Sequence, residues 1–248
     1  MNVKGALIFV FLIVLLLQNN VFGQKASAEL ISSTPPGKLP SGEQVKDGIQ
    51  NLFLKDHLLY VSNIWAGMQI LDVSDVHNPK EVSTYRADRN HNIYVEDNRA
   101  YLSNELSGVD VVDVSDPSNP QKIVTIRTDG DAYWIVARYP HVFVAEESKG
   151  VNVYDISDPA APKKVGGYDT PGWAWGLDIA GNYLYVADMK GGLIILDIGD
   201  PSQIKKVGRV KEITHAKTVQ VEDTYAYVAN GAEGLCIVDV SNPAFPKC

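Results

Sequence analysis

Eight side chains that could contact a ligand occur as four pairs, and each pair lies 42 residues after the one before it. One position separates the two residues of a pair, so in an extended strand both would point to the same side. Aromatic rings and arginine suit contacts with a protein, exposed tryptophan also suits a sugar ring, and the other side chains could fix polar groups. We expect these residues to form one ligand-binding site; they are Arg89 and His91, Asp131 and Tyr133, Trp173 and Trp175, and His215 and Lys217.

The same pairs also have a structural interpretation. Alternation in the segment Trp173-Ala174-Trp175 would equally place both rings between packed sheets, with the neighbouring charges merely solvated. His91, Asp131 and His215 belong to residue types that bind metals, but the chain has no D-x-D-x-D-G run of a calcium loop. We therefore expect no metal ion and no other cofactor.

Sequence motifs of catalysis are absent. The chain contains no HExxH, no GxSxG, no phosphate-binding loop and no GxGxxG before a helix. We assign no catalytic residue on this basis. An enzyme, a hydrolase or a lyase, remains the alternative, because carboxylates from separate repeats can meet at one site.

A repeat of about 42 residues organises the chain. The aspartates that end an apolar run have spacings of 41, 42, 42 and 42 residues, at Asp72, Asp113, Asp155, Asp197 and Asp239. A glycine before each run and an aromatic residue further upstream keep step with them. A fixed period of about 40 to 45 residues is typical of the blades of a β-propeller.

Each repeat divides into four short segments rich in β-branched residues. In the second repeat they are residues 91–97, 99–104, 109–114 and 121–127, with a tight turn at Asp97–Asn98. The third segment is apolar on both faces, which predicts a sheet covered on both sides, and its final aspartate can accept N–H groups of the next turn. We predict an all-β protein, a β-propeller of about five four-stranded antiparallel blades.

The third segments read MQILD, VDVVD, VNVYD, LIILD and LCIVD, and each is followed by a proline-containing turn. These segments resemble the repeats of the LVIVD repeat family, and the resemblance covers residues 48–248. The resemblance implies a β-propeller and a place among exported and cell-surface proteins of bacteria and archaea. It implies no common activity.

The fifth repeat reaches Cys248 where its fourth strand should begin. Residues 28–37, AELISSTPPG, resemble residues 163–172, KKVGGYDTPG, which contain the fourth strand of the third repeat. We expect residues 28–34 to complete the fifth blade and close the ring, with residues 35–44 as the linker. The alternative is a fragment of a larger propeller. The expected organisation is therefore a signal peptide at 1–23, a closing strand and linker at 24–47, and the propeller at 48–248.

The first 23 residues have the layout of a secretory signal peptide. Lys4 is followed by twelve apolar residues, from Ala6 to Leu17, and Gly23 is small enough for a cleavage site. Such a run is short for a membrane span, although an uncleaved anchor is the alternative. We expect a secreted, cell-surface or periplasmic protein that is not inserted in a membrane after cleavage.

The net charge limits the classes of partner, and the cysteine content limits the number of disulfides. The formal net charge of −8 argues against nucleic acid, which attracts basic surfaces. The two cysteines, Cys236 and Cys248, are too few for a disulfide framework, and the sequence leaves open whether they pair.

The loops between the second and third strands differ between repeats and should open at the same end of the propeller as the starts of the first strands. We expect them to bring acidic and aromatic side chains to this face, namely Trp65, Glu105, Glu146, Glu147, Asp188 and Glu233. The sequence thus favours a non-enzymatic binding module for a protein or a polysaccharide, with its site at the channel mouth. It leaves the oligomeric state open.

Overall fold

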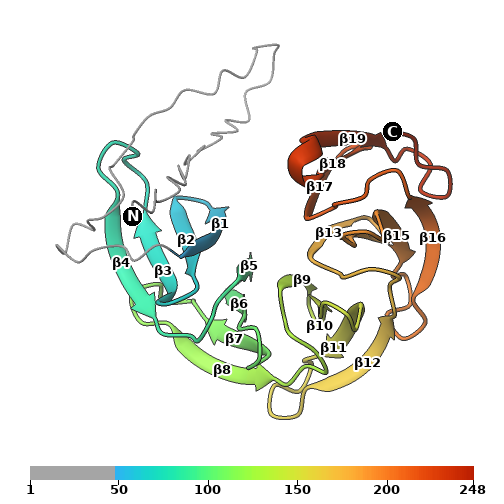
Figure 1. The fold of residues 1–248 in the computed structure, drawn as a ribbon. Coiled ribbons are helices and arrows are strands. Elements are labelled where there is room, and N and C mark those ends of the chain that lie inside the picture. The colour runs from blue at the N-terminus through green and yellow to red at the C-terminus, as the bar shows by residue number, and fades with distance from the viewer. Residues whose placement is uncertain (1–47) are drawn as a thin grey trace, which may run out of the picture.

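The computed structural model describes residues 48–248, which form five antiparallel sheets arranged around a common axis (Figure 1). Four sheets have four strands each, and the fifth has three. The predicted all-β fold and its five repeats are confirmed: the protein is a five-bladed β-propeller. The expected signal peptide at 1–23, and the closing strand and linker within 24–47, lie outside the described residues.

In every blade the strands lie in chain order from the central axis outward. The first blade contains β1 (Ile49–Lys55), β2 (Leu58–Asn63), β3 (Gly67–Asp72) and β4 (Lys80–Tyr85). The second contains β5 (Asn92–Glu96), β6 (Arg99–Ser103), β7 (Val109–Asp113) and β8 (Gln121–Ile126). The third contains β9 (Trp134–Arg138), β10 (His141–Ala145), β11 (Val151–Asp155) and β12 (Lys163–Tyr168). The fourth contains β13 (Gly176–Ala180), β14 (Tyr183–Ala187), β15 (Leu193–Asp197) and β16 (Lys205–Val210). The fifth contains β17 (Thr218–Glu222), β18 (Tyr225–Ala229), the short 3₁₀ helix η1 (Gly231–Glu233) and β19 (Leu235–Asp239).

Short turns set the order of the strands. The turn predicted at Asp97–Asn98 joins β5 to β6, and Asp97 has a φ of 49°. Hairpins with two-residue loops favour such positive φ values, because the turn then matches the twist of the strands. Asp56, Gly181 and Asp223 adopt the same backbone conformation at the equivalent turns.

The aspartate that ends each third strand is part of the scaffold, as predicted. Its Oδ1 accepts the backbone N–H two residues later in every blade: Ser74 at 2.8 Å, Ser115 at 2.8 Å, Ser157 at 2.7 Å, Gly199 at 2.9 Å and Ser241 at 2.9 Å. These bonds lower the pKa of Asp72, Asp113, Asp155 and Asp239, because a donated N–H stabilises the charged carboxylate.

Consecutive blades also meet at their outer strands. Ser83 of β4 donates its hydroxyl to the carbonyl of Pro117, in the turn that follows β7. At the equivalent place in β16, a Cβ on Gly208 would lie 2.1 Å from the carbonyl oxygen of Pro243. The backbone of one blade thus packs directly on the outer strand of the blade before it.

Burial of the face toward the next blade follows the prediction in the first four blades and departs from it in the fifth. The side chains of β3, β7, β11 and β15 that face the next blade are at most 1% exposed; they are Met68, Ile70, Val109, Val111, Val151, Val153, Leu193 and Ile195. Their equivalents in β19, Leu235 and Ile237, are 63% and 50% exposed. The expectation that the sheet is covered on both faces is therefore wrong for the fifth blade, since no described blade packs against this face.

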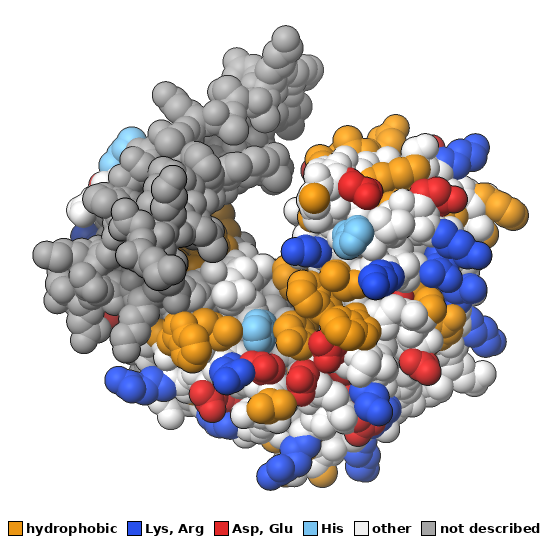
Figure 2. Space-filling model, in the orientation of Figure 1, with side chains coloured by type: hydrophobic (Ala, Val, Ile, Leu, Met, Phe, Trp, Pro, Cys, Tyr) orange, Lys and Arg blue, Asp and Glu red, His pale blue; other side chains and the backbone are white. Residues whose placement is uncertain are grey.

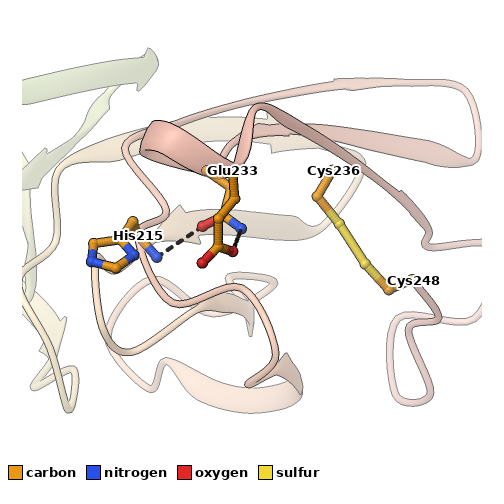
Figure 3. The surroundings of a disulfide bond; sticks show 5 residues. His215, Glu233, Cys236 and Cys248 are labelled. Carbon is orange, nitrogen blue, oxygen red and sulfur yellow. Dashed lines mark hydrogen bonds between the residues drawn. A yellow bond between two sulfur atoms is a disulfide. The ribbon is translucent and has the colours of Figure 1, made fainter.

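The outer edge of the fifth blade ends in a disulfide. Lys247 pairs with Asp239 as Lys205 pairs with Asp197 in the fourth blade, so Lys247 occupies the first position of a fourth strand. The structure joins Cys248, the next residue, to Cys236 of β19 (Figure 3). The pairing that the sequence left open is thus present.

Candidate functional site

The mouth of the propeller is built from two sets of segments that hold each other. The loop after the second strand of one blade forms a β-bridge with the segment that leads into the first strand of the next blade. The bridged pairs are Glu105 and Ala132, Glu147 and Ala174, and Met189 and Ala216. Glu105, Glu147 and Met189 have positive φ values of 42°, 51° and 47°. This face is therefore a backbone network that runs from blade to blade.

Buried carboxylates tighten the network in the third and fourth blades. The Oε2 of Glu146 accepts the N–H groups of Asp129 and Gly130, each at 2.9 Å, and its Oε1 accepts the hydroxyl of Tyr154 at 2.7 Å. Glu146 is completely buried. The expectation that it lies on the mouth face is wrong, because its carboxylate satisfies backbone groups of the adjoining turn.

Asp188 has the same role in the fourth blade. It is also completely buried, and it accepts the hydroxyl of Thr170 at 2.6 Å and the N–H of Gly172 at 2.8 Å. Burial raises its pKa, although these hydrogen bonds act in the opposite direction. Asp188 is thus a second acid that the sequence analysis placed on the surface and the structure places inside.

Four of the eight candidate side chains form a ladder across four blades. The ring centres of His91 and Tyr133 are 4.8 Å apart, and those of Tyr133 and Trp175 are 5.7 Å apart with an angle of 8° between the planes. The ammonium of Lys217 lies 5.9 Å from the ring centre of Trp175. Each such contact contributes about 0.5–1.5 kcal/mol. The equivalent residue of the first blade is Gln50.

The rings of the ladder contact one another through their faces. The Nε1 atom of Trp175 is buried and has no hydrogen-bond partner among the residues that the structure describes. Burial raises the pKa of Tyr133, and the charge of Glu147 adds to the effect, so the phenol stays neutral. Stacking therefore positions these rings, and mainly their edges remain for other contacts.

Glu105 ties the two candidates of the second blade together. Nη1 of Arg89 lies 3.0 Å from Oε2 of Glu105, and Nε2 of His91 lies 3.4 Å from the same oxygen. Burial alone would raise the pKa of Glu105, but hydrogen bonds from Arg89 and His91 outweigh it and lower the pKa. Arg89 therefore has its counter-charge within the protein, and the ring of His91 is held beside the same carboxylate.

The other three candidates occupy the outer position at the same mouth. Trp173 is 51% exposed, and its backbone is fixed on both sides by the N–H of Gly172, which Asp188 accepts, and the N–H of Ala174, which the carbonyl of Glu147 accepts. His215 is held through its own N–H, which the side chain of Asn230 accepts at 2.9 Å (Figure 3). Asp131 lies at the equivalent turn of the third blade, between Gly130 and Ala132.

Of the two interpretations of the tryptophan pair, the structural one describes Trp175 and the ligand-binding one describes Trp173. Trp175 is stacked inside the ladder, whereas Trp173 is open to solvent. Figure 2 shows hydrophobic side chains gathered at the centre of this face, with basic, acidic and histidine side chains around them.

Three residues of this face were not among the eight candidate site residues, although Trp65 and Glu105 were expected on the face and only Leu106 was not. Glu105 was expected only as a loop acid, and its link to Arg89 and His91 was not foreseen. Trp65 and Leu106, at the same loop position in the first and second blades, are 63% and 75% exposed. An apolar side chain in a variable loop between two strands was the available signal for both.

The described residues contain no group of three or more histidine, cysteine, aspartate or glutamate side chains placed to hold a metal ion. His91 contacts the ring of Tyr133 and His215 bonds with Thr214, so the structure does not bring the two histidines together. None of the helices within residues 48–248 has the length and apolar character needed to cross a membrane.

The fold and the arrangement of its mouth define a β-propeller built from sequence repeats. The family model described as "LVIVD repeat" matches residues 49–87, 89–128, 129–170, 171–212 and 214–248. The chain therefore belongs to the LVIVD repeat family, and the resemblance seen in the sequence is confirmed.

A solved structure supports the fold alone. The crystal structure of the computationally designed Ika8 protein superimposes with a TM-score of 0.59 at 11% sequence identity. The alignment covers 81% of this chain and 63% of the designed chain, so this chain spans less than two thirds of that protein. The comparison with curated proteins found no match.

Proposed function

We propose that the protein is an exported, non-enzymatic binding module, secreted or held at the cell surface or in the periplasm, that binds a protein or a polysaccharide at the mouth of the propeller. The observation that carries the proposal is the set of exposed apolar side chains on this face, Trp65, Leu106 and Trp173. Large exposed apolar groups rimmed by polar ones are typical of interaction sites.

Rigidity supports this proposal. Trp173 projects from a turn whose neighbouring N–H groups are both bonded, so a ligand would not have to order this backbone. The mouth positions differ in residue type from blade to blade, while the apolar third strands behind them repeat. A constant scaffold with varied loops is the usual basis of recognition.

The enzyme alternative finds its best support at Asp178 of β13. Burial raises the pKa of this carboxyl, as a general acid requires. However, one of its oxygens accepts the N–H of Val221 at 2.6 Å and the other that of Ile179 at 2.8 Å, so both oxygens serve the backbone. Turnover of a polymer by the purified protein that is lost in Asp178→Asn would favour an enzyme over a binding module.

The binding proposal is tested with the purified protein on arrays of polysaccharides and of proteins from outer cell surfaces. Trp173→Ala and Trp65→Ala should weaken the captured interaction at least about ten-fold. Phe245→Ala is the matched control, because Phe245 is an exposed aromatic residue in the turn after β19, at the opposite end of the blade. Equal effects of all three substitutions, or none, would contradict a site at the mouth.

Export is tested separately by expression of the full chain in a bacterium. The protein should be found outside the cytoplasm, and deletion of residues 2–23 should retain it inside. Export without these residues would contradict the predicted signal peptide.

A further inference from the structure

Some charges of the mouth are paired within the protein and others are not. On the second blade Glu105 forms an ion pair with Arg89 and also contacts His91, whereas on the third blade the carboxylates of Asp131 and Glu147 form no ion pair within residues 48–248. On the fifth blade Lys217 is exposed, and its ammonium has no acidic partner among the described residues. Lys217 thus offers an unpaired cation to a negatively charged ligand group, while the carboxylate of Glu233 on the same blade accepts the side-chain amide of Asn230.

Lys217 is placed to accept such a group without leaving the ladder. The ammonium of Lys217 has three N–H donors. Its contact with the face of Trp175 occupies only one side of the ammonium, so donors remain for a ligand. The stacked rings present edges, which carry the positive part of the ring quadrupole. Both features favour a carboxylate next to Lys217.

Trp173 provides the second contact. It lies two residues before Trp175, and two residues of extended chain span about 7 Å. Its exposed ring is not stacked on the ladder, so a sugar ring could lie against it. The exposed aromatic residues of this face, Trp65 and Trp173, belong to the first and fourth blades, and separate aromatic platforms suit a repeating sugar chain better than one compact protein contact.

We propose that the mouth binds a polysaccharide that carries carboxylate groups, with a sugar ring against Trp173 and a carboxylate on Lys217. This inference rests on the proposed binding function and specifies its ligand. The net charge of −8 makes unspecific attraction of polyanions unfavourable, so binding of an acidic polymer would require a local basic site.

The experiment titrates the purified protein with polygalacturonate, with its fully methyl-esterified form, with dextran and with polyglutamate, followed by calorimetry and tryptophan fluorescence. Polygalacturonate should bind at least about ten-fold more tightly than the other three polymers. Lys217→Gln should lower the affinity for polygalacturonate about ten-fold, to that of the ester, and Trp173→Ala should weaken the binding of polygalacturonate and of its ester about ten-fold each.

Two controls match these substitutions. Lys206→Gln removes an exposed lysine from the outer strand β16, and Phe245→Ala removes an exposed aromatic ring from the opposite end of the fifth blade. Both variants should bind like the unchanged protein, and circular dichroism of every variant should show the same fold. If Lys217→Gln does not fold, the comparison of acid and ester on the unchanged protein still decides the proposal.

Equal affinity for polygalacturonate and its ester, or an unchanged affinity in Lys217→Gln, would overturn this inference. Equal affinity for polyglutamate would also overturn it, because the site would then recognise an acidic peptide. If another polysaccharide or a protein binds and Trp173→Ala abolishes that binding, the proposed function stands without this ligand. If no polymer or protein binds, both proposals fail.

Discussion

Replacement of the buried Glu146 by alanine should destabilise the propeller by about 3 kcal/mol. The substitution leaves the hydroxyl of Tyr154 without its acceptor, and an unsatisfied buried donor costs about 1–3 kcal/mol. The N–H groups of Asp129 and Gly130 are only partly buried and can find water, so together they add about 1–2 kcal/mol. For a domain of this size the loss corresponds to about 6–12 °C in the midpoint of thermal unfolding.

The assay is urea unfolding of a set of variants. Glu146→Gln keeps an acceptor oxygen and should lose less than the alanine variant, and the neighbouring Glu147→Gln should change stability by less than about 0.5 kcal/mol. Tyr154→Phe should destabilise the protein alone but add little in the Glu146→Ala background, because the donor and the acceptor are then both removed. Full additivity of Glu146→Ala and Tyr154→Phe would refute the reasoning, since it would mean that the two side chains do not interact.

Three further predictions address the packing, the turns and the disulfide. Gly208→Val should destabilise the protein by about 1–3 kcal/mol, because the new Cβ would meet the carbonyl of Pro243; thermal unfolding measures the loss. Gly181→Ala is the control: nothing lies near its Cβ, so only the positive φ of this residue should affect stability. The pKa of Asp113 is lowered in the folded state, so its contribution to stability is present above the pKa of the unfolded chain and is lost as the pH falls through the folded value. Asp113→Asn should therefore make unfolding less sensitive to pH in this acidic range, and an unchanged pH profile would contradict the assignment. Cys248→Ser should lower the stability of the fifth blade by about 2–3 kcal/mol in a chain-entropy account, so hydrogen exchange should quicken in β18 and β19 but not in β6 and β7, and uniform exchange would contradict a local role.

The fold could be predicted because the same local signals occur in every repeat. The aspartate of the turn, the glycine before the third strand and the alternation within the strands each act within a few residues, and five copies make them unmistakable. The exposed face of Leu235 and Ile237 could not be predicted in this way, since the sequence of β19 looks like that of the other third strands. Burial depends on which sheet lies against this face, and the segment itself does not encode that.

The sequence predicted the position of the site better than it predicted the role of each residue in it. Two columns of residues marked the mouth, and the structure brings His91, Tyr133, Trp175 and Lys217 into one ladder. The roles of Glu105, Glu146 and Asp188 could not be read from the sequence, because all three are acids in variable loops. Glu146 and Asp188 stand one residue earlier in their loops than Glu105 does, and side chains at this earlier position turn inward to accept backbone N–H groups, as that of Asn230 also does.

The bridges between successive blades make each blade depend on its neighbours. Glu105 links blade two to blade three, Glu147 links blade three to blade four, and Met189 links blade four to blade five. The stability of each of these blades should therefore depend mainly on the blades next to it, as in a one-dimensional repeat array. Within the described residues the fifth blade has a covered face only toward the fourth blade and has three strands. Within this bridged row, opening should therefore start in the fifth blade and proceed toward the second, so the blade that carries Lys217 should be the most sensitive of these four to what binds it.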